Sequence, residues 1–307
     1  MHLIQGTTEF MLDKPCAAAI GKFDGIHRGH QKLLEKILQQ KKKGLLAAVF
    51  TFDPPPAVFF GRAESKGLTT REEKRRIFKR LGVDILIEFP LTSETAAMSP
   101  EQFIDEILVE KMKAAYVAAG TDVTFGDRGR GNKELLFSYG KKHGFTVEII
   151  DKICEKTENG AEISSSLIRG ELERGNMRRV TELIGFPYSV TGTVVHGKKL
   201  GRTIGMPTVN LLPPADKLLP PNGVYYSNVS YGGTHYKSIS NIGCKPTVSE
   251  EQIMGVETYL YDFSEEIYGK EITVNLLEFK RPEMKFSSVG QLKEQMQKDI
   301  AEGKEFV

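Results

Sequence analysis

The chain has 307 residues, enough for two domains at roughly 100–200 residues each. Hydrophobic residues make up 40% and charged residues 27% of the sequence, which is typical of a globular protein. The formal net charge of +2 argues against a nucleic-acid partner, which calls for a strongly basic face. No apolar stretch approaches the ~20 residues needed to span a bilayer, so no membrane partner is expected.

Three scattered cysteines bear on the location of the protein. Cys16, Cys154 and Cys244 are odd in number and lack CxxC spacing, which argues against a disulfide framework or a zinc site. The first residues lack the basic and apolar segments of a secretory signal. We therefore expect a cytoplasmic protein; its oligomeric state does not follow from the sequence.

The first half of the chain alternates short apolar runs with amphipathic helical segments. Thr70 and Glu73 form a capping-box pair ahead of one helix, and Ser99 followed by Pro100 starts another. Such alternation favours a parallel sheet covered on both faces, an α/β layer of the nucleotide-binding type. The expected strands are 17–20, 45–52, 83–89, 116–120 and 145–150.

The pattern changes in the second half. A hairpin is expected over 152–162 around Asn159-Gly160, followed by two short helices at 166–174 and 176–184. Beyond residue 186 the pattern predicts a small closed β-barrel, because closure removes exposed strand edges. Gly232-Gly233 is a good hairpin turn, and 292–300 has the spacing of one C-terminal helix. The expected strands are 189–195, 223–231, 236–242, 256–263 and 272–279.

A polar, glycine-rich segment, GKFDGIHRGH at 21–30, follows the first expected strand and opens a helix. Parallel sheets bind ligands beyond the carboxyl ends of their strands, where a helix N-terminus offers unpaired N–H donors to phosphate. His27 and His30 are three residues apart and can reach the same point, where they would offset charge on a reacting phosphate. A capping role for the histidines is the alternative, and zinc binding is weaker because companion ligands are missing.

The segment ISSSLIR at 163–169 is the natural partner of the first. Serines at a helix start and Arg169 one turn later would bring hydroxyls, N–H groups and a guanidinium together, a combination that suits polyphosphate. A simple serine N-cap is the alternative.

A second candidate site lies in the glycine-spaced segment 192–210. Its spacing is not that of a P-loop, but oriented backbone N–H groups can still wrap a nucleotide. Thr208 and Asn210 are two residues apart, so an extended chain points both to one face. Their hydroxyl and amide oxygens suit Mg²⁺ bridged by phosphates. A barrel turn with a glycine bulge is the alternative.

Glu257 is the candidate base for the second site. It begins a strand with alternating residues, in which its side chain points to the opposite face from Val256, and Leu260 lies a step out of phase with this alternation. A solvated strand carboxylate is the alternative, and the residues alone favour that alternative.

Together these segments resemble the prokaryotic bifunctional riboflavin kinase/FMN adenylyltransferase (FAD synthetase) family over nearly the full length. The motifs occur in the family's order. They are GxFDGxHxGH at 21–30, ISSxxIR at 163–169, GRxxGxPTxN at 201–210, NGVY at 222–225, NIG at 241–243 with Pro246-Thr247, Glu257 with Asp262-Phe263, Tyr268-Gly269 and Arg281-Pro282-Glu283.

The resemblance implies two domains and two reactions. A Rossmann-like nucleotidyltransferase domain over 1–185 would join FMN and ATP into FAD and pyrophosphate. An all-β closed-barrel riboflavin kinase domain with a C-terminal helix, over 186–307, would transfer the γ-phosphoryl group of ATP to riboflavin and give FMN. The implied partners are riboflavin, FMN and ATP, with Mg²⁺ as the cofactor and FMN and FAD as products.

The resemblance also assigns residues, with His27, His30 and Glu257 catalytic and Thr208 and Asn210 holding the metal. At the adenylyltransferase it assigns ATP to Gly21, Phe23, Asp24, Gly25, His27, Gly29, His30, Ser165, Ser166 and Arg169, and FMN to Asp53 and Asp122. At the kinase it assigns ATP to Gly197, Lys199, Gly201, Thr208 and Asn210, and the flavin to Asn241, Leu260 and Arg281.

Some positions depart from the family pattern. Pro55 stands where His commonly follows Asp-Pro, and Val123 replaces an aromatic residue; both belong to the implied FMN side of the adenylyltransferase. Val209 and Ser166 are milder exchanges. Two other hypotheses therefore stand beside the bifunctional enzyme: only one of the two activities is retained, or the chain is a flavin- or nucleotide-binding regulator without turnover.

Overall fold

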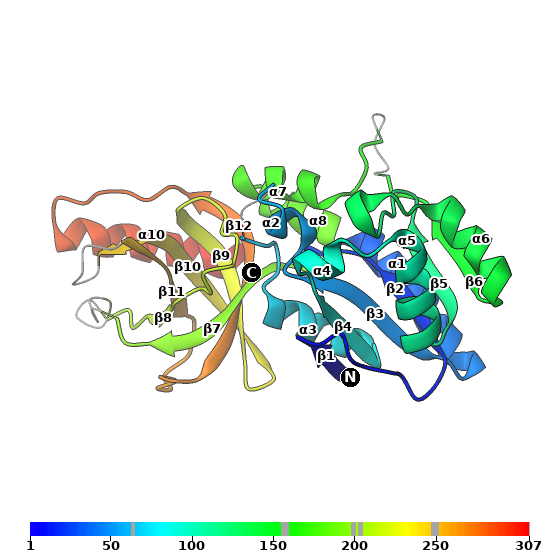
Figure 1. The fold of residues 1–307 in the computed structure, drawn as a ribbon. Helices are drawn as coiled ribbons and strands as arrows, with labels where there is room; N and C mark the ends of the chain where they lie inside the picture. The colour runs from blue at the N-terminus through cyan, green and yellow to red at the C-terminus, as the bar shows by residue number, and fades with distance from the viewer. Residues whose placement is uncertain (63–64, 155–159, 198–200, 202–204, 247–251, 307) are drawn as a thin grey trace. The chain divides into compact units, whose positions relative to one another are not determined.

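The computed structural model describes residues 1–307 except 63–64, 155–159, 198–200, 202–204, 247–251 and 307 (Figure 1). The chain divides into two compact units, Met1–Ser165 and Ser166–Val307. The sequence places the boundary near residue 186, whereas the structure groups α7 (Ser165–Glu173) and α8 (Met177–Ile184) with the second unit. This grouping follows from packing, because α8 lies against two strands of the barrel.

The first unit is built on one parallel sheet of six strands in the order β1-β4-β3-β2-β5-β6, with helices on its faces (Figure 1). The expected α/β fold is therefore confirmed. The edge strand β1 was not expected; its four residues are too few to show a pattern, and it pairs only with β4. The strands are β1 (His2–Gln5), β2 (Cys16–Ile20), β3 (Leu46–Asp53), β4 (Ile85–Pro90), β5 (Ala114–Gly120) and β6 (Thr146–Ile150).

The strand order creates a topological switch at β2. From β2 the chain continues to β3 on one side of β2, and it later returns to form β5 on the other side. The direction in which successive strands are added to the sheet therefore reverses at β2. Parallel sheets bind ligands in the crevice beyond the carboxyl end of such a strand. The loop 21–27, which leaves β2, occupies this position.

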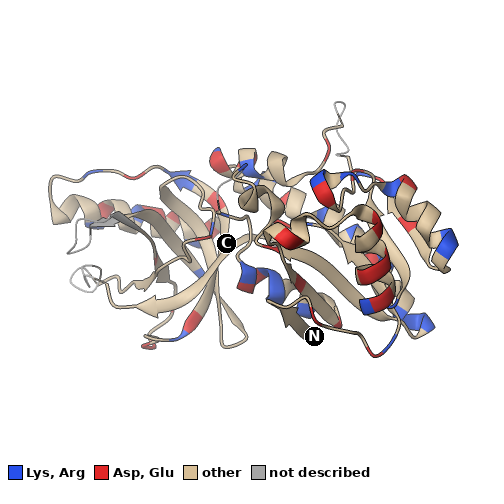
Figure 2. Cartoon of the chain, in the orientation of Figure 1, with Lys and Arg blue, Asp and Glu red and all other residues tan. Residues whose placement is uncertain are grey.

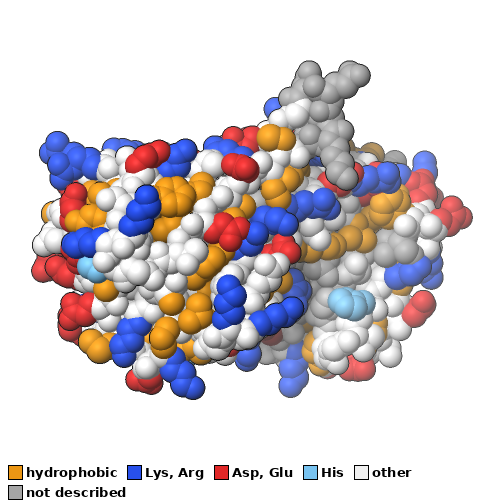
Figure 3. Space-filling view, turned by 90° about the vertical axis from the view of Figure 1, so that its right-hand side faces the viewer, with side chains coloured by type: hydrophobic (Ala, Val, Ile, Leu, Met, Phe, Trp, Pro, Cys, Tyr) orange, Lys and Arg blue, Asp and Glu red, His pale blue; other side chains and the backbone are white. Residues whose placement is uncertain are grey.

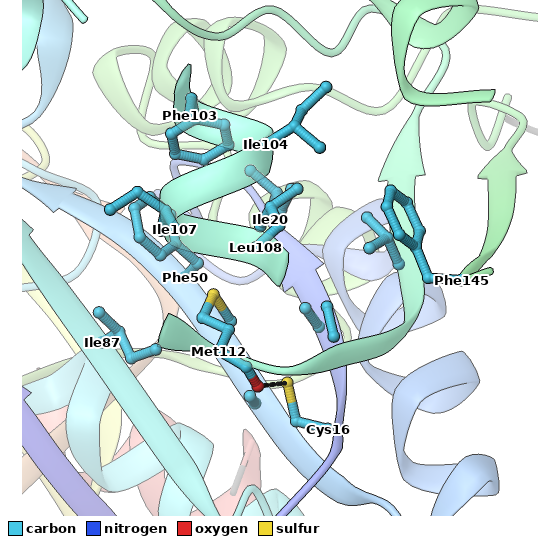
Figure 4. Packing of buried hydrophobic residues seen from close by; sticks show 14 of the residues in the cluster. Cys16, Ile20, Phe50, Ile87, Phe103, Ile104, Ile107, Leu108, Met112 and Phe145 are labelled. Carbon is cyan, nitrogen blue, oxygen red and sulfur yellow. Dashed lines mark hydrogen bonds between the residues drawn. The ribbon is translucent and has the colours of Figure 1, made fainter. Parts of the chain in front are cut away.

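Strand β2 shows how the sheet is buried. Cys16 and Ala18 belong to the core on one face, while Ala17 and Ala19 belong to the core on the other. This period of two is the geometry of a strand covered on both sides. Figure 4 shows the first core, where the Cys16 thiol donates to the carbonyl of Met112 at 3.2 Å.

The helices of the first unit follow their capping signals. Thr70 and Glu73 form the reciprocal capping box that the sequence predicts, and Ser99 does the same with Gln102. The helix that Ser99 opens continues as a π-helix with its apolar residues against the sheet (Figure 4). The helices are α1 (Arg28–Gln39), η1 (Gln40–Lys43), α2 (Pro56–Phe59), α3 (Arg71–Leu81), α4 (Ser93–Ala96), α5 (Pro100–Gln102), η2 (Phe103–Lys111), η3 (Asp127–Gly129) and α6 (Lys133–His143).

The second unit holds the expected closed barrel, with strand order β10-β11-β8-β7-β12-β9. The β9–β10 hairpin turns at Gly232-Gly233 as predicted. Four hydroxyl groups inside the barrel, those of Ser227, Ser238, Ser240 and Thr258, form a hydrogen-bonded chain with 2.8 Å spacings. The elements are β7 (Tyr188–Val195), β8 (Val209–Leu211), β9 (Gly223–Tyr231), β10 (Thr234–Pro246), β11 (Gln252–Leu260), β12 (Glu271–Arg281) and α10 (Val289–Phe306).

The surface carries both signs of charge, in keeping with the net charge of +2. Basic and acidic residues occur along both units (Figure 2), and on the face in Figure 3 they are interspersed with small apolar areas. None of the described helices is long and apolar enough to cross a membrane. Of the expected 152–162 hairpin, Cys154 and Glu162 pair in antiparallel fashion, while Asn159 lies outside the described residues.

Candidate active sites

The first site is the loop 21–27 and the start of α1. The Asp24 carboxylate accepts the backbone N–H of Leu68 at 2.8 Å, and the Asp24 carbonyl accepts the Ser165 hydroxyl at 2.9 Å. Gly25 has φ of +78°, and a Cβ there would lie 2.9 Å from the Leu68 side chain. Glycine is favoured at this position because a side chain would strain the positive-φ backbone and crowd Leu68.

Two non-glycine residues in this loop have left-handed backbones. Phe23 has φ of +51° and Ile26 has φ of +43°, and both side chains are fully buried. Such a conformation costs about 1–3 kcal/mol per residue and persists only where the surroundings impose it. The loop is therefore held in one shape, with the Phe23 ring 5.1 Å from the His30 ring.

His27 and His30 meet as the sequence predicts. Their rings stack with centroids 3.8 Å apart, at the start of α1. His27 is the N-cap residue but makes no side-chain capping hydrogen bond, so capping does not explain it. The Nδ1 atoms of both rings are buried and have no hydrogen-bond partner in the described part of the chain. These unpartnered ring nitrogens lie beside a helix N-terminus, whose free N–H groups favour an anion.

Burial determines the charge of the two histidines. It lowers the pKa of His27 to about 4, against the smaller opposing effect of the Asp24 and Glu162 carboxylates. Burial also lowers the pKa of His30 well below its usual value, and the neighbouring His27 and Lys74 lower it further. Both imidazoles are therefore neutral at pH 7, and each offers an N–H donor rather than a positive charge.

The predicted FMN residues flank this loop. Asp53 ends β3 and forms an ion pair with Arg71, and Asp122 follows β5 and lies 3.3 Å from the Lys152 ammonium. Since β3 and β5 are the neighbours of β2, both carboxylates stand at the sheet edge where the loop 21–27 leaves. Val123, which departs from the family pattern, packs against the core.

Other predicted residues of the first site are dispersed. Gly21 donates its N–H to the Phe50 carbonyl at 3.2 Å, and Gly29 lies in the first turn of α1. Ser166 and Arg169 lie on α7 in the second unit. Their contact with nucleotide at the first site stays a prediction.

The second site is formed where β8 meets β11. Asn210 lies directly opposite Glu257 in the strand pairing, and the Thr208 hydroxyl donates to the Glu257 carboxylate at 2.5 Å. Among the described residues no three His, Cys, Asp or Glu side chains gather as a metal site. The oxygen atoms of Thr208 and Asn210 fit an oxygen-ligated cation such as Mg²⁺ in kind.

The glycine spacing in this region has a steric reason. A Cβ on Gly197 would lie 2.3 Å from the amide nitrogen of Asn210, so the backbone at 197 packs directly on the predicted ligand. Gly201 lines the cavity described next. Lys199, predicted to contact ATP, lies outside the described residues.

A cavity of about 260 Å³ opens beside Glu257, between the barrel and α10. Its polar lining includes Thr208, Asn241 and Glu257. Its apolar wall includes Val224, Ile239, and three residues of α10 that recur at helical spacing, Leu292, Met296 and Ile300. The spacing of these three residues in the sequence predicts the helix, but it does not show that the helix lines a cavity.

The three predicted flavin residues have different positions. Asn241 lines the cavity and donates to Glu283 at 3.2 Å. Leu260 is buried on the other face of β11, and its neighbour Tyr259 lines the cavity. Arg281 lines the cavity, but its guanidinium also binds Asp299 of α10 through two nitrogens. The sequence analysis did not find Tyr259, Glu283 or Asp299.

The first unit has a parallel sheet of the nucleotide-binding type, with a helix N-terminus at its switch point. The second unit has a barrel with a carboxylate beside a cavity. Together they define the class of the protein as a two-domain enzyme that acts on phosphate groups. The FAD synthetase family model matches residues 10–167, and the riboflavin kinase family model matches residues 184–307. The chain belongs to the bifunctional riboflavin kinase/FMN adenylyltransferase family, and the resemblance seen in the sequence is confirmed.

Relatives of known name agree over nearly the whole chain. The bifunctional riboflavin kinase/FMN adenylyltransferase of Listeria monocytogenes is 37% identical, covering 98% of this chain and 95% of the relative. The enzyme of the same name from Bacillus subtilis is 38% identical over 92% and 90%, and that from Escherichia coli strain K12 is 34% identical over 95% and 92%.

A solved structure also matches over nearly the full length. It is a protein of Streptococcus pneumoniae described as a macrolide-efflux protein, with a TM-score of 0.86, 30% sequence identity and 97% of each chain covered. The match supports the fold of both units, and the efflux description belongs to that protein.

Proposed function

We propose that this chain converts riboflavin to FMN at the second site and FMN to FAD at the first, using ATP in both reactions. The observation that carries the proposal is the hydrogen bond between Thr208 and Glu257, two residues that line a cavity with both apolar and polar side chains. A cavity that combines apolar side chains with several polar groups suits a flat ring system that bears a hydroxylated chain.

At the second site Glu257 acts as the base. Its carboxylate accepts the proton of the riboflavin 5′-hydroxyl as that oxygen forms a bond to the γ-phosphorus of ATP and the bond to ADP breaks. The Thr208 hydrogen bond fixes the orientation of the carboxylate, and Gly197 allows the Asn210 amide to sit beside it. Thr208 and Asn210 would hold Mg²⁺, which supplies charge neutralisation for the phosphates when bound.

At the first site the helix N-terminus and the two neutral imidazoles donate hydrogen bonds to ATP. An FMN phosphate oxygen forms a bond to the α-phosphorus, and the bond to pyrophosphate breaks. The N–H donors stabilise the negative charge that grows on the phosphate oxygens, and the fixed loop supplies them without reorganisation. Ser165, Ser166 and Arg169 complete the polyphosphate site in this proposal.

A cytoplasmic location is part of the same proposal. All three cysteines are free thiols, two of them exposed, which suits a reducing compartment.

The test is a product assay with purified protein, riboflavin, ATP and Mg²⁺. We expect FMN to appear first and FAD to follow, with one ADP for each FMN and one pyrophosphate for each FAD. FMN that accumulates without FAD would reduce the proposal to a kinase alone. FAD formed only when FMN is supplied would reduce it to an adenylyltransferase alone.

A further inference from the structure

Lys74 is a half-buried cation beside the first site that no motif of the chain includes. It lies in the first turns of α3, and its ammonium donates to the Lys22 carbonyl at 3.4 Å, within the segment that leaves β2. It is also close enough to His30 to lower the pKa of that imidazole. Lys74 therefore stands at the same crevice as the stacked histidines.

The charges around Lys74 leave it without a close partner. Asp24, Asp53 and Glu88 act on it electrostatically, opposed by Arg71. Each of these carboxylates has another contact: Asp24 with the Leu68 N–H, Asp53 with Arg71, and Glu88 with Arg75. In the part of the chain that the structure describes, Lys74 forms no ion pair within 4 Å.

The Lys74 ammonium has three N–H donors, and one long hydrogen bond uses only one of them. Loss of solvent around the ammonium lowers the pKa of Lys74, so the protein's own groups do not fully compensate the charge that this side chain carries. A phosphate group would supply the missing acceptors and the opposite charge. The unpartnered Nδ1 atoms of His27 and His30 point to the same need for an anion.

We propose that Lys74 is a further catalytic residue of the adenylyltransferase, whose ammonium directly contacts a phosphate group of the nucleotide at the start of α1. This inference rests on the proposed first site. Because both histidines are neutral, Lys74 supplies the site with a full positive charge, whereas the imidazoles supply only N–H donors. The charge stabilises the phosphate oxygens as pyrophosphate departs.

The experiment compares K74Q, K74R and the control K79Q, which changes an exposed lysine of the same helix. FAD formation from FMN and ATP is measured from pH 7 to pH 10, FMN formation from riboflavin reports on the second site, and the unfolding temperature reports on the fold. We expect K74Q to lower kcat/KM for FAD formation about 100-fold or more, the usual effect of losing one such group, with FMN formation unchanged. K79Q should match the wild type in both reactions.

The K74R variant distinguishes two possible roles of Lys74: a positive charge in contact with phosphate, and a purely structural role. Arginine keeps its charge at high pH, so K74R should retain part of the activity and lose the alkaline decline of kcat/KM that deprotonation of Lys74 gives the wild type. Wild-type FAD formation tests the proposed site separately. The inference is overturned if K74Q forms FAD within threefold of the wild type, or if K74R keeps the wild-type alkaline decline. Should K74Q fail to fold, K74R alone decides.

Discussion

Arg281 of β12 donates two hydrogen bonds to Asp299 of α10, from guanidinium nitrogens that lie 3.0 and 2.6 Å from one carboxylate oxygen. Asp299 is only 2% exposed, and Gln295 donates to its other oxygen at 2.9 Å. Both members of the pair line the cavity beside Glu257. The ion pair therefore fastens the helix that forms the apolar wall of that cavity to the barrel.

The first prediction concerns this ion pair. D299N keeps the size of the side chain but leaves the partly buried Arg281 charge without its ionic partner, which costs about 1–3 kcal/mol. We expect a lower unfolding temperature and a several-fold higher KM for riboflavin, with little change in FAD formation from supplied FMN. The matched control is E302Q, which breaks the more exposed Lys280–Glu302 pair between the same two elements. An unchanged riboflavin KM in folded D299N would contradict the wall role.

A second prediction follows from the contact between Gly197 and Asn210. G197A would place a methyl group 2.3 Å from the Asn210 amide nitrogen, so the amide must move from its place beside Glu257. We expect kcat/KM for FMN formation to fall about 10- to 100-fold, as misplacement of a positioned group does. FAD formation from FMN should stay unchanged.

The control for this variant is G170A on α7, where a Cβ would meet only the end of Arg174 at 3.9 Å. G170A should leave both reactions as in the wild type. An equal kcat/KM for FMN formation in G197A and G170A would show that the kinase reaction does not depend on the position of Asn210.

A third prediction concerns pH and the buried histidines. An unfolded histidine binds a proton near pH 6.5, whereas His27 in the folded chain binds one only near pH 4. Between these values the unfolded state holds more protons, so stability is fully present above pH 6.5 and is lost as the pH falls toward 4. His30 acts in the same direction.

The measurement is the unfolding temperature of wild type and H30Q from pH 8 to pH 4.5. We expect the wild type to lose stability steadily below pH 6.5, and H30Q to show a shallower decline over the same range. An H30Q curve parallel to that of the wild type would mean that His30 is not buried in its neutral form.

Much of the fold was predictable because the pattern of apolar residues along a segment indicates which of its residues are buried. β2, β9 and the Thr70 capping box are found where the sequence expects them, since period two and paired capping residues are local signals. The edge strand β1 and the π-helical turn of η2 were not, because four residues show no period and a π-helix depends on packing.

The sites divide in the same way. His27, His30 and the Thr208–Asn210 pair lie in short motifs whose spacing brings them together. Lys74, Tyr259 and Asp299 belong to helices and strands without a motif, and only tertiary packing brings them to the sites. The flavin contact that the family resemblance implies for Leu260 stays a prediction, and it is the neighbouring Tyr259 that lines the cavity.

The central claim is that one chain holds two independent sites that act in sequence. Its most direct test is the product profile of H30A and E257Q, each incubated with riboflavin or with FMN, plus ATP and Mg²⁺. The account predicts that H30A turns riboflavin into FMN but makes no FAD, and that E257Q makes FAD from FMN but no FMN from riboflavin. Loss of both activities in either variant, while the protein remains folded, would contradict the assignment of two separate sites.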